Sequence, residues 1–476
     1  MSLETDKKFL LKSTLYNFLG TAFKVAAPAL MFVLARIFGK EEFGIFVSTQ
    51  LLIFTLSRVS ILGLDRGLHW FLPQNSVKNR IFNLGFNESL RYAITISVII
   101  FTVLFAGSML GLQKYSESLA ALSSVELSLY ALSVMPLAVL HLLGGAAEGM
   151  RKPQYKIFIT DCAAYTLAPL ISIALHFAGI SNALPVGLLA SNILGCFIYM
   201  PLIKKILPFS FISFKSKMPR ELLVYSVPCG IADIVGSVLI RIDMWLVLLL
   251  LGPGQAGVYA IMVTISAGLR TILHSYIPIL LPVVAGMSKE KLNTDLKPVF
   301  TYCVNMIALI QLAIGFFIVL FPDKILMLAG KEFIVQPETL GILMFSHLLG
   351  GFFQLTGTVL NGIGKSLYML KMTAASLCVA FTVSYFLIPV FGLPGAALST
   401  LAYILLQCIW NTVYIFKLNL RLYSKKVIPY IIWSAFLLFV YILLPHFSLE
   451  FWQKIIFYIA VLCVLAITHV KIQKAS

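Results

Sequence analysis

The sequence predicts an all-α integral membrane protein with fourteen transmembrane helices. Three observations support this fold class: the composition, the length of the apolar runs and the distribution of the basic residues. Of the 476 residues, 60% are hydrophobic and only 12% are charged, whereas soluble domains are about 45–50% apolar and about 25% charged. A soluble core cannot bury so large an apolar excess, so most of it must face lipid or other helices.

Fourteen apolar stretches are each long enough to cross a bilayer, which requires about 20 apolar residues per helix. They cover residues 12–37, 44–68, 86–111, 125–148, 157–178, 185–206, 222–251, 256–284, 299–321, 338–361, 367–390, 395–416, 427–446 and 451–470. All seven cysteines lie inside these stretches without metal-ligand spacing, so we expect neither a disulfide framework nor a metal site. No connecting loop is long enough for a catalytic domain, and the chain has no GxxxxGK[ST] motif for ATP. We therefore expect neither an enzyme nor a bound cofactor.

The basic residues alternate from loop to loop. Of the 36 lysines and arginines, 25 fall at the termini and in one set of alternate loops, and only five fall in the opposite set. Because loops rich in lysine and arginine stay in the cytoplasm, this asymmetry predicts that both termini are cytoplasmic. The net charge of +17 is therefore a signal of topology and does not indicate nucleic-acid binding.

An internal repeat with an offset of 213 residues relates the two halves of the chain. The motif Gly39-Lys40-Glu41-Glu42-Phe43-Gly44-Ile45-Phe46 corresponds to Gly252-Pro253-Gly254-Gln255-Ala256-Gly257-Val258-Tyr259, and the same offset aligns Gly149, Lys152 and Tyr155 with Gly362, Lys365 and Tyr368. Each half holds six predicted helices, an even number, so the halves are parallel repeats about an axis along the membrane normal. The sequence predicts an N-terminal lobe at 1–210, a C-terminal lobe at 211–420 and two further helices at 421–476.

Four basic residues lie within predicted helices, where a charge costs about 2.5–3.5 kcal/mol and normally faces a cavity or a partner. They are Lys24, Arg58, Arg241 and Arg270. Arg58 follows Gly44 by 14 positions and Arg270 follows Gly257 by 13, so the two arginines occupy nearly equivalent places in the repeats. Guanidinium groups bind phosphate oxygens in pairs and lysine acts as a point charge. We therefore predict that these four residues bind a diphosphate.

Internal ion pairing is the alternative interpretation of these charges. It would pair Arg58 with Asp65, Arg241 with Asp233 or Asp243, and Arg36 with Glu41.

Other polar residues recur at helical spacing inside the predicted helices. His347, Gln354 and Asn361 follow one another at seven-residue intervals, and His141 and Glu148 stand at the equivalent interval in the first half. Together with Asp233 they are candidates for contacts with sugar or with a coupling ion. The alternative is that they form hydrogen bonds between neighbouring helices.

Several of these motifs resemble a known family. The run from Ala35 to Phe46 is similar to the opening of the polysaccharide transporter family, whose members are lipid-linked oligosaccharide flippases of the multidrug/oligosaccharidyl-lipid/polysaccharide exporter superfamily. Supporting stretches are Gly63-Leu64-Asp65-Arg66-Gly67, Pro228 with Arg241-Ile242-Asp243, and Asn361-Gly362-Ile363-Gly364-Lys365.

The resemblance implies two lobes that form a V-shaped bundle around a central cavity. It also implies alternating access that moves an undecaprenyl-diphosphate-linked glycan from the cytoplasmic to the outer leaflet of the bacterial inner membrane, for a surface polysaccharide such as O-antigen. Polymerases and other glycan assembly proteins are then expected partners. The membrane potential or a gradient of H+ or Na+ would drive the movement.

Three other functions remain open at this point. A lipid II flippase of the same superfamily also carries cations on its first, second and eighth helices. A multidrug cation antiporter would need an acidic cavity, whereas here mid-membrane bases outnumber acids. A membrane enzyme of glycan assembly would need paired carboxylates on a loop, and the loops of this sequence hold none.

Overall fold

The computed structural model describes residues 3–72, 80–111, 122–150, 155, 166–204, 218–285, 287, 295–420, 422–443 and 450–474. In these ranges the chain is helical and contains no β-strand. Eleven of the described helices are long and apolar enough to cross a membrane. The chain is therefore a multi-pass membrane protein, and the all-α prediction is confirmed. The number fourteen stays a prediction; the first part of the predicted stretch 157–178, residues 157–165, lies outside the described residues.

The helices fall into two compact units, Met1–Arg241 with Gly252–Gly257, and Ile242–Leu251 with Val258–Ser476. The first unit contains α1 (Leu3–Ile61), α2 (Leu64–Phe71), α3 (Arg80–Met109), α5 (Ser124–Leu132), α6 (Val134–Gly149), α8 (Ala168–Phe177), α9 (Ala183–Lys204) and α10 (Arg220–Leu239). The second contains α11 (Ile242–Leu251), most of α12 (Pro253–Ala285), α14 (Leu296–Leu320), α15 (Pro322–Met327), η4 (Lys331–Phe333), α16 (Glu338–Phe353), α17 (Leu355–Gly362), α18 (Ser366–Phe391), α19 (Leu393–Lys417), η5 (Lys425–Val427), α20 (Ile428–Leu443) and α21 (Phe451–Lys474). The lobe boundaries expected at 210 and 420 stay a prediction.

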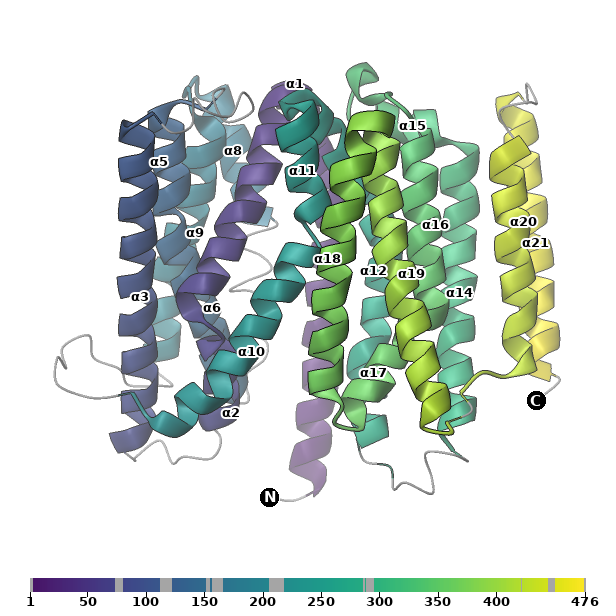
Figure 1. Cartoon of the computed structure of the whole chain (residues 1–476), viewed down its shortest axis with the longest axis horizontal. Coiled ribbons are helices and arrows are strands. Elements are labelled where there is room, and N and C mark those ends of the chain that lie inside the picture. The colour runs from purple at the N-terminus through teal and green to yellow at the C-terminus, as the bar shows by residue number, and fades with distance from the viewer. Residues whose placement is uncertain are drawn as a thin grey trace. The chain divides into compact units, whose positions relative to one another are not determined.

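Helix α6 lies at the centre of the first unit, where it packs against α1, α2, α3 and α9. Its side chains Leu142, Leu143 and Ala146 are fully or almost fully buried together with Leu68 of α2 and Phe86 of α3. Helices α3, α5 and α9 run side by side along this unit (Figure 1). Because α6 is mostly apolar and nearly all its residues are buried, it serves as the core against which the neighbouring helices bury one face each.

The helices of the structure differ from the predicted membrane-spanning stretches at several points. Two of these stretches contain a helix break, although the apolar sequence continues through it. The stretches 12–37 and 44–68 correspond to two helices, both within α1, that meet at Gly39, whose backbone is not helical (φ 75°, ψ 171°) and has a conformation that glycine adopts without steric cost. The second stretch ends at Ile61, because Leu62 and Gly63 have positive φ angles of 42° and 76° and α2 begins after them. The stretch 222–251 is divided as well: the amide of Arg241 donates to the carbonyl of Val238, three residues earlier, and α11 starts at Ile242.

The two copies of the repeated glycine motif contact each other inside the first unit. A Cβ atom on Gly257 would lie 1.9 Å from the carbonyl oxygen of Lys40, and one on Gly44 would lie 2.1 Å from that of Pro253. Only glycine allows two helix backbones to approach this closely. The repeat found in the sequence therefore has a direct packing role at this crossing.

The second unit is built around α16, α18 and α19. Helix α19 packs along both α16 and α18, and α16 also contacts α14. The C-terminal helices α20 and α21 both pack on α14 (Figure 1), and the Tyr430 hydroxyl of α20 bonds to the His469 ring of α21.

Candidate functional site

A cluster of charged side chains surrounds the Phe54 ring of α1 in the first unit. The guanidinium carbons of Arg58 and Arg241 lie 5.2 Å and 4.3 Å from the centre of this ring. The His141 ring of α6 meets it edge to face, with the centroids 5.2 Å apart. An aromatic face attracts cations, so one phenylalanine gathers two of the predicted diphosphate ligands and one of the predicted sugar ligands.

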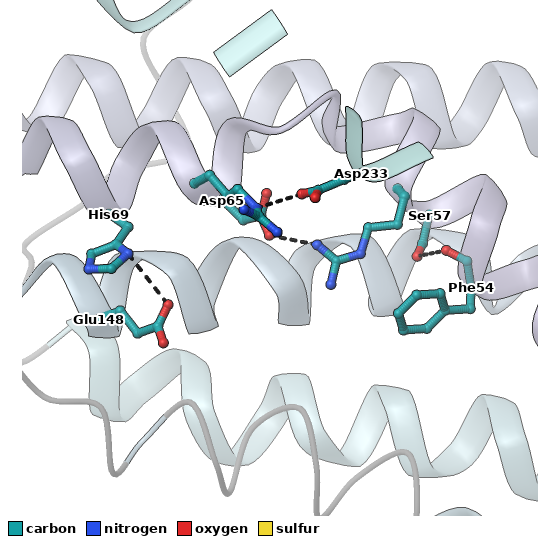
Figure 2. A network of polar contacts seen from close by, with 8 residues as sticks. Phe54, Ser57, Asp65, His69, Glu148 and Asp233 are labelled. Atoms are coloured by element: carbon teal, nitrogen blue, oxygen red, sulfur yellow. Dashed lines mark hydrogen bonds and ion pairs between the residues drawn. The ribbon is translucent and has the colours of Figure 1, made fainter. Parts of the chain in front are cut away.

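Two ion pairs extend this cluster, as Figure 2 shows. Arg58 Nη1 lies 2.7 Å from Asp65 Oδ2 and bridges the break between α1 and α2. Arg66 Nε lies 2.7 Å from Asp233 Oδ2 and joins α2 to α10. Asp233 is also close enough to Arg58 and Asp65 to interact with both electrostatically. Arg58 and Arg66 therefore pair with the two aspartates, and Arg241 lies beside Arg58 on the Phe54 ring.

Close backbone contacts hold the break between α1 and α2 in place. A Cβ on Gly63 would lie 2.3 Å from the carbonyl oxygen of Ser226 in α10, and one on Gly145 of α6 would lie 2.3 Å from that of Asp65. A Cβ on Gly230 would likewise meet the backbone of Leu62 at 2.3 Å. Three helices thus meet at Gly63 without room for a side chain, and this fixes where Asp65 and Arg66 point.

A second polar contact lies further along α2. His69 Nδ1 is 3.7 Å from Glu148 Oε2 of α6 (Figure 2). Glu148 is therefore associated with a histidine side chain, and it lies beside the same helix α2 that carries Asp65 and Arg66.

The structure distinguishes between the two interpretations of the basic residues. The alternative pairing of Arg58 with Asp65 is confirmed. The pairing of Arg241 with Asp233 or Asp243 stays a prediction. Asp233 forms an ion pair with Arg66, and Arg241 stacks on Phe54 and donates to the Ser237 carbonyl at 3.3 Å. Within the described part of α1, Arg36 and Glu41 form no ion pair.

Arg270 of α12 belongs to a separate polar group in the second unit. It lies close enough to Asp243, His347 and Tyr403 to interact with each electrostatically. The Asp243 carboxyl is buried and accepts hydrogen bonds from the Tyr259 hydroxyl at 2.7 Å, the Thr400 hydroxyl at 3.0 Å and the Met244 amide at 2.8 Å. Asp243 is therefore fixed by neutral donors. Among the residues that the structure describes, Arg270 makes no ion pair within 4 Å, unlike Arg58.

The predicted stripe of His347, Gln354 and Asn361 does not lie along one straight helix. Helix α16 ends at Phe353 and α17 begins at Leu355, so the helix is interrupted at Gln354. His347 is buried, Gln354 Nε2 donates to Gln407 Oε1 of α19 at 2.9 Å, and Asn361 is exposed. Gln354 thus makes the hydrogen bond between helices that the alternative interpretation predicted.

Lys24, the remaining predicted phosphate ligand, lies on α1, and its side chain falls outside the described residues. Across the part of the chain that is described, no group of three histidine, cysteine, aspartate or glutamate residues is suited to hold a metal ion.

Comparison with known proteins identifies the family. Residues 10–288 match the model of a family described as polysaccharide biosynthesis proteins. The chain belongs to this family. None of the curated proteins matches it in sequence.

Solved structures of very different sequence share the fold. A lipid II flippase, MurJ, in an inward closed conformation superimposes with a TM-score of 0.74 at 11% identity, over 95% of this chain and 98% of that one. An inward-facing multidrug resistance transporter of the MATE family in the MOP superfamily gives 0.63 at 15% identity, over 84% and 98% of the two chains. A MOP superfamily transporter from Pyrococcus furiosus gives 0.57 at 14% identity, over 87% and 97%. The chain therefore shares the fold of these three transporters.

Two residues of the cluster could not be assigned from the sequence. Phe54 is one of 36 phenylalanines, and nothing in its local sequence sets it apart. Arg66 lies in the Gly-Leu-Asp-Arg-Gly motif, and its position near a predicted helix end suggested an interfacial side chain. Only the packing of α10 against α2 brings Asp233 to it.

Proposed function

We propose that this protein is a flippase that moves a polyprenyl-diphosphate-linked oligosaccharide from the cytoplasmic to the outer leaflet of the inner membrane. Family membership supports a role in polysaccharide biosynthesis. The observation that supports the proposal is the convergence of two guanidinium groups on Phe54. Arg58 lies in the candidate span Pro28–Ile61, and Arg241 follows the candidate span Arg220–Leu239 by two residues. A diphosphate is too costly to transfer bare through lipid, and paired guanidinium groups offset that cost.

In the proposed mechanism the two predicted lobes alternate access while the lipid tail stays in the bilayer. Lys24 and Arg270 would add positive charge to the diphosphate site. Six further polar residues would contact sugar or a coupling ion: His141, Glu148, Asp233, His347, Gln354 and Asn361. The inside-negative potential favours outward movement of an anion by about 2.3 kcal/mol per charge per 100 mV, so the potential, alone or with H+ or Na+, would supply the driving force. No catalytic step and no resident cofactor is needed.

A lipid II flippase is the second candidate, and the fold similarity to MurJ favours it. Both substrates carry a diphosphate, so the basic cluster suits either. A multidrug cation antiporter fits less well, because both aspartates of the cluster pair with arginines and two guanidinium groups lie against Phe54, where an organic cation would be repelled.

Reconstitution distinguishes the candidates. The purified protein in liposomes would be supplied with a fluorescent polyprenyl-diphosphate oligosaccharide, lipid II or an organic cation, and exposure in the opposite leaflet would be measured. We expect the oligosaccharide lipid to be moved fastest. Faster movement of lipid II would reassign the substrate, and export of the cation alone would contradict the proposal.

A further inference from the structure

A cavity of about 330 Å³ with two lysines in its lining lies in the second unit, apart from the residues of the candidate site. Its lining comprises Lys297, Pro298, Thr301, Tyr302, Asn305, Ser424, Lys426 and Ile472. These residues come from the first turns of α14, from η5 and the residue before it, and from the last turn of α21. Small-molecule sites have volumes of roughly 300–1,000 Å³, so the cavity is of a size to hold part of a lipid headgroup.

The cavity lies where membrane-crossing helices end. Helices α14 and α21 are both candidate spans; α14 begins at Leu296 and α21 ends at Lys474. Lys297 and Ile472 line the cavity and lie one and two residues from these helix ends, so they must be near the membrane surface. Lys297 and Lys426 also belong to the basic set of loops that predicts the cytoplasmic side.

Two buried polar atoms in this cavity lack a protein partner. Thr301 and Asn305 are only 6% and 3% exposed, and among the described residues neither Thr301 Oγ1 nor Asn305 Oδ1 has a hydrogen-bond partner. Other threonines, such as Thr264 and Thr373, donate their hydroxyl groups to the backbone carbonyl four residues earlier. Buried polar atoms are rarely left unsatisfied, so a polar ligand is expected at this position.

The charge of the lining specifies the ligand. Of the described residues that line the cavity, Lys297 and Lys426 are charged and none is acidic. The N-terminus of α14 has no acidic residue in its first turn, and the Asp295 side chain does not cap it, so the positive end of the helix dipole adds to the two lysines. Together with the Thr301 hydroxyl, these groups match the oxygens of a phosphate.

We propose that this cavity binds the phosphate of an anionic phospholipid of the cytoplasmic leaflet. The two lysines attract the phosphate, the Thr301 hydroxyl donates to one of its oxygens, and Tyr302 and Ile472 lie against the apolar part of the lipid. Basic pockets between transmembrane helices on the cytoplasmic side bind anionic headgroups in this way. The site is separate from the proposed transport site and would anchor α14, α20 and α21 to the membrane surface.

Native mass spectrometry of the purified protein titrated with phosphatidylglycerol tests this proposal. Each lysine near a membrane surface contributes about 1 kcal/mol, so Lys297→Ala/Lys426→Ala should weaken phosphatidylglycerol binding roughly thirty-fold. Thr301→Val, which keeps the shape and removes the hydroxyl, should weaken it roughly two- to ten-fold. The matched controls are Lys331→Ala/Lys454→Ala, which removes the same charge elsewhere, and Thr373→Val; both should bind as the parent does.

Binding measurements with two other ligands show whether the bound phosphate belongs to an anionic lipid. Phosphatidylcholine and inorganic phosphate should each bind far more weakly than phosphatidylglycerol. Parental binding by the double-lysine variant and by Thr301→Val, or equal binding of phosphatidylcholine or of inorganic phosphate, would overturn the proposal.

Discussion

Arg58 Nη1 of α1 lies 2.7 Å from Asp65 Oδ2 of α2, across the break at Leu62 and Gly63. The side chains of this pair are 21% and 14% exposed, and the same guanidinium lies beside Phe54. Arg58 therefore has a structural partner and a position suited to the substrate, and the two roles can be separated by mutation.

Replacing Arg58 with alanine should lower both stability and transport. Loss of a hydrogen bond between charged groups costs about 1.5–3 kcal/mol, so the melting temperature of the purified protein should fall. The reversed pair, Arg58→Asp/Asp65→Arg, should recover much of the melting temperature. Transport should stay low in the reversed variant, because its guanidinium no longer lies at Phe54. Full recovery of transport would show that Arg58 acts only through the ion pair.

The Phe54 ring should contribute to transport through the two arginines that it orients. A cation–π contact is worth about 0.5–2 kcal/mol, so Phe54→Leu should slow the flipping rate by roughly two- to thirty-fold in reconstituted liposomes. Phe54→Tyr keeps the ring and should retain most of the rate. Phe101→Leu on α3 removes a phenylalanine that stacks on Phe105, and it should have little effect. Equal rates for Phe54→Leu and Phe101→Leu would exclude a role for the ring.

The crossing of the two glycine motifs should be intolerant of a single methyl group. Gly257→Ala would place Cβ 1.9 Å from the Lys40 carbonyl oxygen, and overpacking of this kind costs about 1–3 kcal/mol. Gly268→Ala is the matched control, because it lies on the same helix α12 and its Cβ would meet nothing within 4 Å. We expect a lower melting temperature for Gly257→Ala and an unchanged or higher one for Gly268→Ala. The same melting temperature in both variants would contradict the crossing.

The sequence was sufficient to predict the all-α membrane fold class and the ion pair of Arg58 with Asp65, and insufficient to predict the helix breaks and the other side-chain partners. The apolar runs 44–68 and 222–251 are continuous, so hydropathy could not locate the breaks at Gly63 and Arg241. These breaks depend on backbone torsion and on contacts such as that of Gly63 with Gly230. The pair of Arg66 with Asp233 joins residues 167 positions apart, and only tertiary packing brings them together. By contrast, Asp65 lies seven residues after Arg58, so that pair was among the sequence-based alternatives.

The predicted topology can be checked by labelling single cysteines in a cysteine-free background. Lys215→Cys lies in a loop of the basic set and Lys114→Cys in a loop of the opposite set. The positive-inside rule predicts that a membrane-impermeant reagent added to intact cells labels position 114 and not position 215. Labelling of position 215 from outside would reverse the orientation, and with it the direction of the proposed transport.

The most direct test of the central claim is the flipping rate of a polyprenyl-diphosphate oligosaccharide by the Arg58→Ala/Arg270→Ala variant in liposomes. The two arginines occupy nearly equivalent places in the repeats, and both are proposed to bind the diphosphate. We predict that the double variant is incorporated into the liposomes as the parent is, and that its flipping of the oligosaccharide lipid is abolished. A double variant that flips this lipid at the parental rate would contradict the proposed basic site and leave both arginines with structural roles.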